Sequence, residues 1–181
     1  AWLVSIDAPQ EIVTHAARDG LQLEGLLIRP LNEKPGDKYP LVVVVHGGPE
    51  AQYTPGHSPF TQFLVNEIGA VVIAPNIRGS SGYGKSYLQL DNGMLREDAI
   101  KDIGSLLVWI GLQPDLDRER VVVMGGSYGG YLTLASLVHY SDRLRGGVNT
   151  VGISNFITFL ENTSAYRRDL RRAEYGDERE P

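Results

Sequence analysis

Three unbroken apolar runs stand out in the chain, at residues 41–45, 70–74 and 121–124. Strands that are apolar on both faces are typical of a parallel sheet covered by helices on both sides. Between the runs, apolar residues recur at helical spacing. The first such set shares one helix face and comprises Phe60, Phe63, Leu64 and Ile68. The second set comprises Ala99, Ile100, Ile103, Leu107 and Ile110. The pattern therefore predicts alternating strands and helices.

The segment before the first apolar run predicts an antiparallel hairpin. Residues 11–16 and 21–28 are compatible with strands, and Asp19-Gly20 between them is a strong tight-turn signal. A third helix is expected after residue 127, and a further strand at residues 146–151. Alternation of this kind predicts an α/β fold with right-handed crossovers. We interpret residues 1–181 as part of a single domain.

Each apolar run leads into a loop of unusual composition. The loops read His-Gly-Gly-Pro at residues 46–49, Pro-Asn-Ile-Arg-Gly-Ser-Ser-Gly-Tyr-Gly at residues 75–84, and Gly-Gly-Ser-Tyr-Gly-Gly at residues 125–130. In an open α/β sheet, ligands bind at the carboxyl ends of the strands. Because three such loops would meet at one edge of the sheet, we expect the functional site there.

The third loop has the pattern of a nucleophile elbow, in which a strained serine sits between a strand and a helix. The residues two before and two after the serine must then be very small. Gly125 and Gly129 meet that demand around Ser127, and Gly126 relaxes it further. The helix that begins at Tyr128 would point its positive end at a developing oxyanion. The alternative is a glycine-rich turn without chemistry.

The first loop is a candidate for half of an oxyanion hole. Such a hole uses the backbone N–H after the nucleophile, here that of Tyr128, and one N–H from a loop after an earlier strand. Gly48 allows close approach of the backbone, so its N–H is the second candidate. For the His46 side chain we expect a structural role.

Composition excludes several classes of function. The net charge is −5, which disfavours nucleic acid as a partner because phosphate binding needs clustered lysine and arginine. The chain has no cysteine, which excludes disulfides and thiolate metal sites and suits the cytoplasm. No apolar run reaches the length that spans a bilayer. We expect no metal, no organic cofactor and no membrane partner, and the sequence indicates no particular oligomeric state.

The three loops, in this order and at this spacing, resemble the prolyl oligopeptidase family of serine peptidases, especially its acylaminoacyl-peptidase and dipeptidyl-peptidase-like branch. The likeness extends from Asp19 to Gly176. It implies an α/β-hydrolase fold and a peptidase that cleaves short peptides through an acyl-enzyme on Ser127. It also implies an N-terminal β-propeller. By position, the resemblance places Ile153, Phe156 and Phe159 in the substrate pocket, with Tyr128 nearby, although helix packing alone would also explain the two phenylalanines.

A general base for Ser127 is not evident in the chain. Three of the four histidines precede Ser127, whereas this fold places the base after the nucleophile. His139 lies twelve residues after Ser127 on the same predicted helix and cannot fold back to it. We therefore expect a partial catalytic domain that ends before the strands carrying the triad aspartate and histidine, and that is inactive alone. We interpret residues 166–181, which are highly charged, as a solvated helix that frays.

Two other functions remain open. A carboxylesterase or lipase of the same fold would share the elbow, but its first loop usually reads His-Gly-Gly-Gly, and Pro49 favours the peptidase. The second alternative function is that of a catalytically dead hydrolase-fold module used for binding. An intact strained serine weakens this hypothesis, because the strain has no structural benefit.

Overall fold

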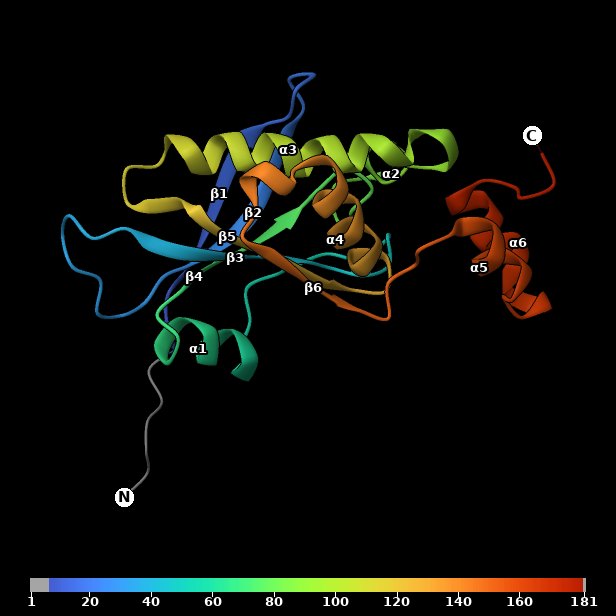
Figure 1. Ribbon diagram of the computed structural model, residues 1–181. Coiled ribbons are helices and arrows are strands. Elements are labelled where there is room, and N and C mark those ends of the chain that lie inside the picture. Colours follow the sequence, from blue (N-terminus) through green and yellow to red (C-terminus); the bar gives the residue numbers. More distant parts are fainter. Residues whose placement is uncertain (1–6, 181) are drawn as a thin grey trace.

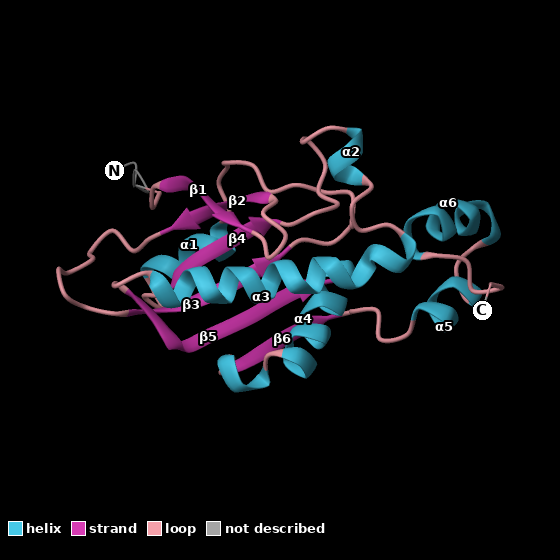
Figure 2. Cartoon of the chain, turned by 90° about the horizontal axis from the view of Figure 1, so that it is seen from above, coloured by secondary structure: helices cyan, strands magenta, loops and turns pink. Residues whose placement is uncertain are grey.

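The computed structural model describes residues 7–180; the two ends of the predicted domain, residues 1–6 and 181, lie outside the described part. Within it, six strands form one sheet in the order β1-β2-β4-β3-β5-β6. The strands are β1 (Gln10–Ala16), β2 (Gln22–Ile28), β3 (Tyr39–Val45), β4 (Val71–Asn76), β5 (Leu116–Gly126) and β6 (Gly146–Thr150). Figure 2 shows this order across the sheet.

Strand direction confirms the predicted sheet. β1 and β2 form the antiparallel hairpin, and β2 continues antiparallel to β4. β4, β3, β5 and β6 are parallel neighbours. At the centre, Val43 lies opposite Ile73 on one side and Val123 on the other, and all three side chains have no exposed surface. These in-register residues point to one face of the sheet, and Val72 and Ala74 are buried on the other face, as the continuous apolar runs predicted.

Helices cover both faces of the sheet. They are α1 (Pro59–Asn66), α2 (Lys85–Leu88), α3 (Arg96–Leu112), α4 (Tyr128–His139), α5 (Phe156–Glu161) and α6 (Ala165–Tyr175), with short 3-10 turns at Gly93–Leu95 and Ser141–Arg143. Figure 1 shows α1 below the sheet, α3 and α4 above it, and α5 and α6 beyond one end of the strands. No described helix is both long and apolar enough to cross a bilayer.

The predicted inner face of α3 is confirmed. Its five expected core residues are all buried, and Leu106 joins them. Glu97 and Asp98 lie in the first turn, where the helix dipole favours negative charge. α3 therefore lies firmly on the sheet with its N-terminal end toward α5 and α6.

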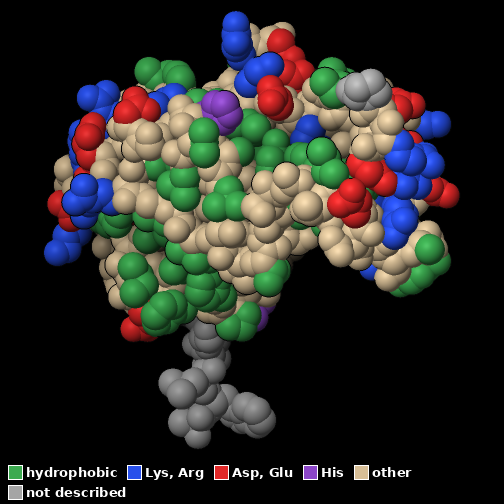
Figure 3. Space-filling view, turned by 45° about the vertical axis from the view of Figure 1, so that its right-hand side comes forward, with side chains coloured by type: hydrophobic (Ala, Val, Ile, Leu, Met, Phe, Trp, Pro, Cys, Tyr) green, Lys and Arg blue, Asp and Glu red, His purple; other side chains and the backbone are tan. Residues whose placement is uncertain are grey.

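The inner face expected for α1 is wrong. Phe60 and Phe63 are about half exposed, at 52% and 50%, whereas Gln62 and Val65 are the buried positions. The Gln62 Oε1 accepts the Ala8 N–H at 2.9 Å, which satisfies the oxygen of this buried amide but not its nitrogen. Figure 3 shows hydrophobic side chains exposed on the lower part of the molecule, where α1 lies.

Candidate active site

The backbone at Ser127 has the geometry of a nucleophile elbow. β5 ends at Gly126, α4 begins at Tyr128, and Ser127 between them has φ 56° and ψ −117°. Such a conformation is sparsely populated for a residue with a Cβ and costs about 1–3 kcal/mol. The Ser127 N–H donates to the Thr150 carbonyl at the end of β6, at 3.0 Å. The strained serine is thus held at the carboxyl edge of the sheet with its side chain exposed.

Two of the three neighbouring glycines are required by space. A Cβ on Gly125 would lie 2.5 Å from the Gly129 carbonyl, and one on Gly129 would lie 2.2 Å from the Val45 carbonyl oxygen. A Cβ on Gly126 would meet nothing closer than the Thr150 oxygen, at 3.5 Å. Close contact between β3, β5 and α4 therefore explains Gly125 and Gly129, while Gly126 has room for a side chain.

A fourth glycine, which the sequence did not single out, is as constrained as these. A Cβ on Gly130 would lie 2.5 Å from both the Asn149 Oδ1 and the Gly152 Cα. The Asn149 Oδ1 also accepts the Gly152 N–H at 2.9 Å. The loop after β6 therefore packs directly on the first turn of α4. In the sequence, the pair of glycines at residues 129 and 130 was the feature that could have indicated this close contact.

The His-Gly-Gly-Pro loop lies against the elbow. A Cβ on Gly47 would lie 3.5 Å from the Ser127 Cβ and 3.1 Å from the Gly126 oxygen. Gly48 follows with φ 128°, which a residue with a Cβ rarely adopts. Within residues 7–180, neither the Gly48 N–H nor the Tyr128 N–H donates a hydrogen bond. Both expected oxyanion donors are therefore free to bind a ligand atom.

His46 braces this loop. Its Nε2 lies 2.9 Å from the Ser80 Oγ and its Nδ1 2.8 Å from the Gly47 oxygen. The ring also packs edge-on against Tyr53, with 5.5 Å between centroids. Burial lowers the pKa of His46, so the ring is neutral at neutral pH. These contacts agree with the structural role expected from the sequence.

Arg78 connects the second loop to two other segments of the chain. Its guanidinium contacts Asp102 on α3 at 2.8 Å and Asp19 of the hairpin turn at 3.1 Å. The backbone N–H of Arg78 also donates to the Asp102 carboxylate at 3.0 Å. Asp102 has no exposed surface. The contacts connect the hairpin, the second loop and α3.

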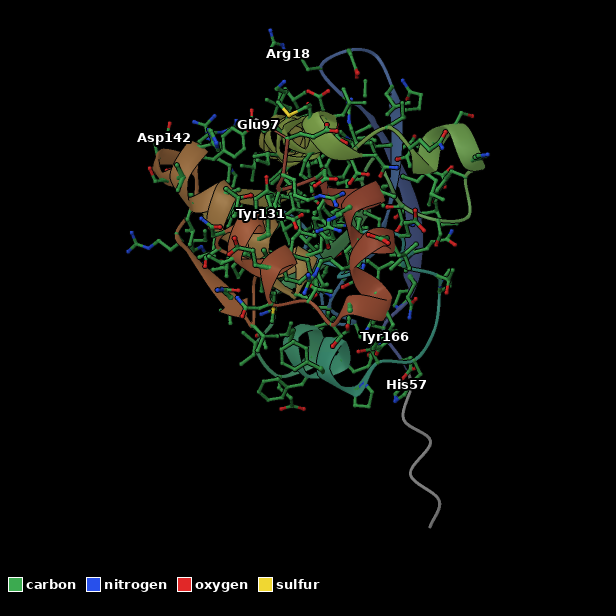
Figure 4. The ribbon with its side chains drawn as sticks, turned by 90° about the vertical axis from the view of Figure 1, so that its right-hand side faces the viewer. Arg18, His57, Glu97, Tyr131, Asp142 and Tyr166 are labelled. Carbon is green, nitrogen blue, oxygen red and sulfur yellow. The ribbon has the colours of Figure 1, made fainter. Side chains whose placement is uncertain are left out.

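The other histidines lie away from the serine. His15 is buried on β1 beside Trp109, with 6.1 Å between ring centroids. His57 contacts Asp7 at 2.8 Å and lies at the lower edge of the molecule in Figure 4. His139 is exposed at the end of α4. Among the described residues, no histidine hydrogen-bonds Ser127, and no three histidine or acidic side chains are grouped to hold a metal ion.

A cavity of about 240 Å³ opens beside the serine. Besides Ser127 it is lined by residues of α5 and α6 and the turn between them: Phe159, Thr163, Ser164, Tyr166, Arg167, Arg171 and Tyr175. Figure 4 looks onto these two helices, with Tyr166 at the lower end of α6. Of the three residues expected in the substrate pocket, Phe159 lines this cavity. Phe156 packs against Tyr175 but lines a different cavity, and Ile153 belongs to the buried core.

The solvated helix expected at residues 166–181 is confirmed for the start of α6, where Tyr166 is 86% and Leu170 63% exposed, but is wrong for its last turn. Figure 3 shows charged side chains of both signs gathered over this region, yet the last turn of α6 buries Glu174 and Tyr175. Tyr175 packs between Phe156 and Phe159, with 5.2 Å between centroids in each case. An aromatic ring at the end of a charged helix buries enough apolar area to hold that turn against the domain. Residue 181 lies outside the described residues.

A buried arginine connects α6 to the elbow. The Arg96 guanidinium lies 4.9 Å from the ring centroid of Tyr128 and 4.7 Å from that of Tyr175. It also pairs with Asp91 at 2.5 Å, and Asp91 accepts the Tyr128 hydroxyl at 2.9 Å. Burial raises the pKa of the Asp91 carboxyl, and the charge of Arg96 opposes that shift. Sequence patterns did not reveal this group, because its members lie far apart in the chain.

Comparison with known proteins agrees with this geometry. A family model described as the prolyl oligopeptidase family matches residues 56–181. The chain is 36% identical to dipeptidyl aminopeptidase BIII of Pseudoxanthomonas mexicana over 164 residues. The matched region covers 87% of this chain and 24% of that protein.

Solved structures agree as well. The acylaminoacyl peptidase of Pyrococcus horikoshii matches with a TM-score of 0.86 and 28% identity, over 98% of this chain and 29% of that one. An acylaminoacyl peptidase in complex with Z-Gly-Gly-Phe-chloromethyl ketone matches with a TM-score of 0.85 and 28% identity. This match covers 97% of this chain and 28% of that one. The chain spans about a quarter of the length of these relatives. The elbow, the two glycine-containing loops and these matches together show that the chain belongs to the prolyl oligopeptidase family.

Proposed function

We propose that this chain carries the nucleophile and the oxyanion hole of a serine peptidase that hydrolyses short peptides. The backbone of Ser127, with φ 56° and ψ −117° between β5 and α4, is the observation that carries the proposal. A serine held in this conformation projects its hydroxyl out of the sheet toward a bound carbonyl. Family membership and the peptidyl ligand of one solved relative support a peptide as the substrate.

The reaction proceeds through an acyl-enzyme. The Ser127 Oγ forms a bond to the scissile carbonyl carbon while its proton passes to a general base. The tetrahedral oxyanion is stabilised by the N–H groups of Tyr128 and Gly48. The C–N bond then breaks and the amine leaves with the proton. A water molecule then attacks the carbonyl carbon of the ester. The bond between that carbon and the Ser127 Oγ breaks, which releases the carboxylic acid and regenerates the Ser127 hydroxyl.

The general base and its orienting acid are assigned to a histidine and an aspartate outside residues 7–180. The support is the placement of the four histidines. His46 is held by Ser80, and the other three hydrogen-bond neither Ser127 nor each other. The 181-residue chain by itself is then inactive, because removing the base from such a serine costs several orders of magnitude in kcat.

The cavity of about 240 Å³ beside Ser127 is proposed to receive the side chain that precedes the cleaved bond. Phe159 supplies an apolar wall, and Phe156 and Phe159 both pack against Tyr175, which also lines the cavity. The cavity also holds polar groups from α6, including the guanidinium of Arg171.

A fluorophosphonate probe tests the nucleophile, because it phosphonylates only an activated serine. The protein expressed from its complete gene should be labelled at Ser127. Ser127→Ala should abolish labelling, whereas Ser141→Ala, at an exposed serine of a remote turn, should leave it unchanged. The 181-residue chain should be labelled at least about 1,000-fold more slowly. Fast labelling of that chain would contradict the assignment of the base.

Substrate comparison tests the reaction class. The complete gene product should cleave acyl-peptide anilides in a manner abolished by Ser127→Ala. Turnover of p-nitrophenyl esters without amide cleavage would identify an esterase instead. Absence of both activities, together with absence of probe labelling, would identify a catalytically dead binding module.

A further inference from the structure

The Gly48 carbonyl is held by a distant part of the chain. Gly47 and Gly48 give the loop after β3 more backbone freedom than any other pair of residues would. Pro49 follows and has no N–H with which to anchor the loop. The Gly48 oxygen nevertheless accepts hydrogen bonds from the Tyr175 hydroxyl at 3.1 Å and from the Arg171 Nη1 at 3.3 Å. Both donors belong to α6, more than 120 residues later in the sequence.

The two donors are themselves fixed. Tyr175 is buried, and its ring packs against Phe156 and Phe159. Burial raises its pKa to about 12, so the hydroxyl keeps its proton at neutral pH and remains a donor. Arg171 pairs with the buried carboxylate of Glu174 at 2.5 Å. The Gly48 carbonyl is therefore attached to a rigid last turn of α6.

The same turn of α6 reaches the other side of the oxyanion hole. Arg96 lies between the rings of Tyr175 and Tyr128, within 5 Å of each centroid, and contacts the Glu174 carbonyl. Tyr128 offers one oxyanion N–H and Gly48 the other. Both therefore depend on contacts made by residues 171–175.

We propose that Tyr175 and Arg171 are positioning residues: by holding the Gly48 carbonyl, they fix the direction in which the Gly48 N–H points toward the Ser127 oxyanion. This inference rests on the proposed function. Two hydrogen bonds on the carbonyl restrict rotation about the φ and ψ angles of Gly48, and the N–H of the same residue is then held in one direction. An oxyanion donor acts only within about 2.7–3.1 Å of the oxyanion, so small displacements are costly.

The effect should fall on kcat rather than on KM, because the oxyanion exists only in the transition state. Removal of a whole oxyanion donor lowers kcat by about 100- to 1,000-fold, so a displaced donor should lose about 10-fold. Tyr175→Phe deletes only the hydroxyl and keeps the ring in its aromatic contacts. We expect it to lower kcat about 10-fold with KM changed less than about twofold.

The matched control is Tyr140→Phe. The Tyr140 hydroxyl donates to the Ile100 carbonyl at 3.2 Å, a tyrosine-to-carbonyl bond of nearly the same length at the far end of α4. This variant should keep the kcat of the unmodified protein. Tyr175→Phe combined with Arg171→Lys, which keeps a cation beside Glu174, should lower kcat further than Tyr175→Phe alone. Equal kcat for Tyr175→Phe, Tyr140→Phe and the unmodified protein would overturn the proposal.

Amide hydrogen exchange supplies a readout that needs no activity. In the double variant, the amide of Ala51, which donates to the Pro49 carbonyl at 2.7 Å in the same loop, should exchange at least about fivefold faster, while those of β3 keep their rates. Unchanged exchange in the loop would overturn the positioning role whether or not the protein is a peptidase. Failure of the proposed function is distinguishable, because it would show as Ser127-independent activity or as no activity in the unmodified protein.

Discussion

Gly129→Ala is the sharpest test of the elbow. The new Cβ would lie 2.2 Å from the Val45 oxygen and 2.8 Å from the His46 oxygen. The first distance is more than 1 Å shorter than the 3.4 Å at which ordinary contact begins. Both oxygens belong to the backbone of β3 and its loop, so no side chain can rotate away. The strain is relieved only if α4 moves away from β3.

Two free-energy contributions oppose each other in this variant. Overpacking a core position costs typically about 1–3 kcal/mol, and contact with fixed backbone places this case at the upper end. Alanine gains about 1 kcal/mol over glycine inside a helix. We therefore expect a net loss of about 2 kcal/mol in the free energy of unfolding. Because Ser127 precedes α4 directly, a shift of about 1 Å should also slow its reaction about 100-fold.

Gly126→Ala is the matched control. Its Cβ would meet only the Thr150 oxygen at 3.5 Å, an ordinary contact, three residues away from the other substitution. Stability should change by less than about 0.5 kcal/mol and the reaction rate by less than about threefold. Urea denaturation and the rate of fluorophosphonate labelling, both on the complete gene product, measure the two effects. Equal behaviour of Gly129→Ala and Gly126→Ala would refute the steric account of the elbow.

Two further predictions concern buried charge. Burial lowers the pKa of His15 from 6.5 to about 4, so the unfolded chain binds a proton that the folded chain excludes, and stability falls by about 2–3 kcal/mol as pH drops from 6.5 to 4. His15→Leu should flatten that part of the stability profile in urea denaturation; an unchanged slope would contradict the assignment. Arg78→Met should cost about 3 kcal/mol or more because it leaves the buried Asp102 unpaired, whereas Arg118→Met, whose partner Glu119 is exposed, should stay within about 0.5 kcal/mol.

Much of the fold could be predicted because its signals are local. The continuous apolar runs identified the central strands, and the inner face of α3 followed from helical spacing alone. α1 shows the limit of this reasoning. Its phenylalanines have the spacing of a buried face, but its position below the sheet turns Gln62 and Val65 inward. Periodicity describes which residues share a face; packing decides which face is buried.

The candidate site divides in the same way. Gly125, Ser127 and Gly129 lie within five residues, so their joint requirement for a tight turn was visible in the sequence. The hydrogen bond between the Tyr175 hydroxyl and the Gly48 carbonyl spans 127 positions in the chain, and no local sequence pattern predicts it. The charge of residues 166–181 predicted a solvated helix, which is correct for the start of α6 but not for its buried last turn.

The sequence by itself therefore determined the α/β class, the strained serine and the two loops beside it, because each depends on residues that are neighbours in the chain. Only the tertiary structure decided that the last turn of α6 is buried, that Arg96 lies between Tyr128 and Tyr175, and that the Gly48 carbonyl is held from α6. The physical reason is that burial and hydrogen bonding between distant segments depend on how the elements pack together. Those contacts form only once the sheet, α3 and α6 have been brought together.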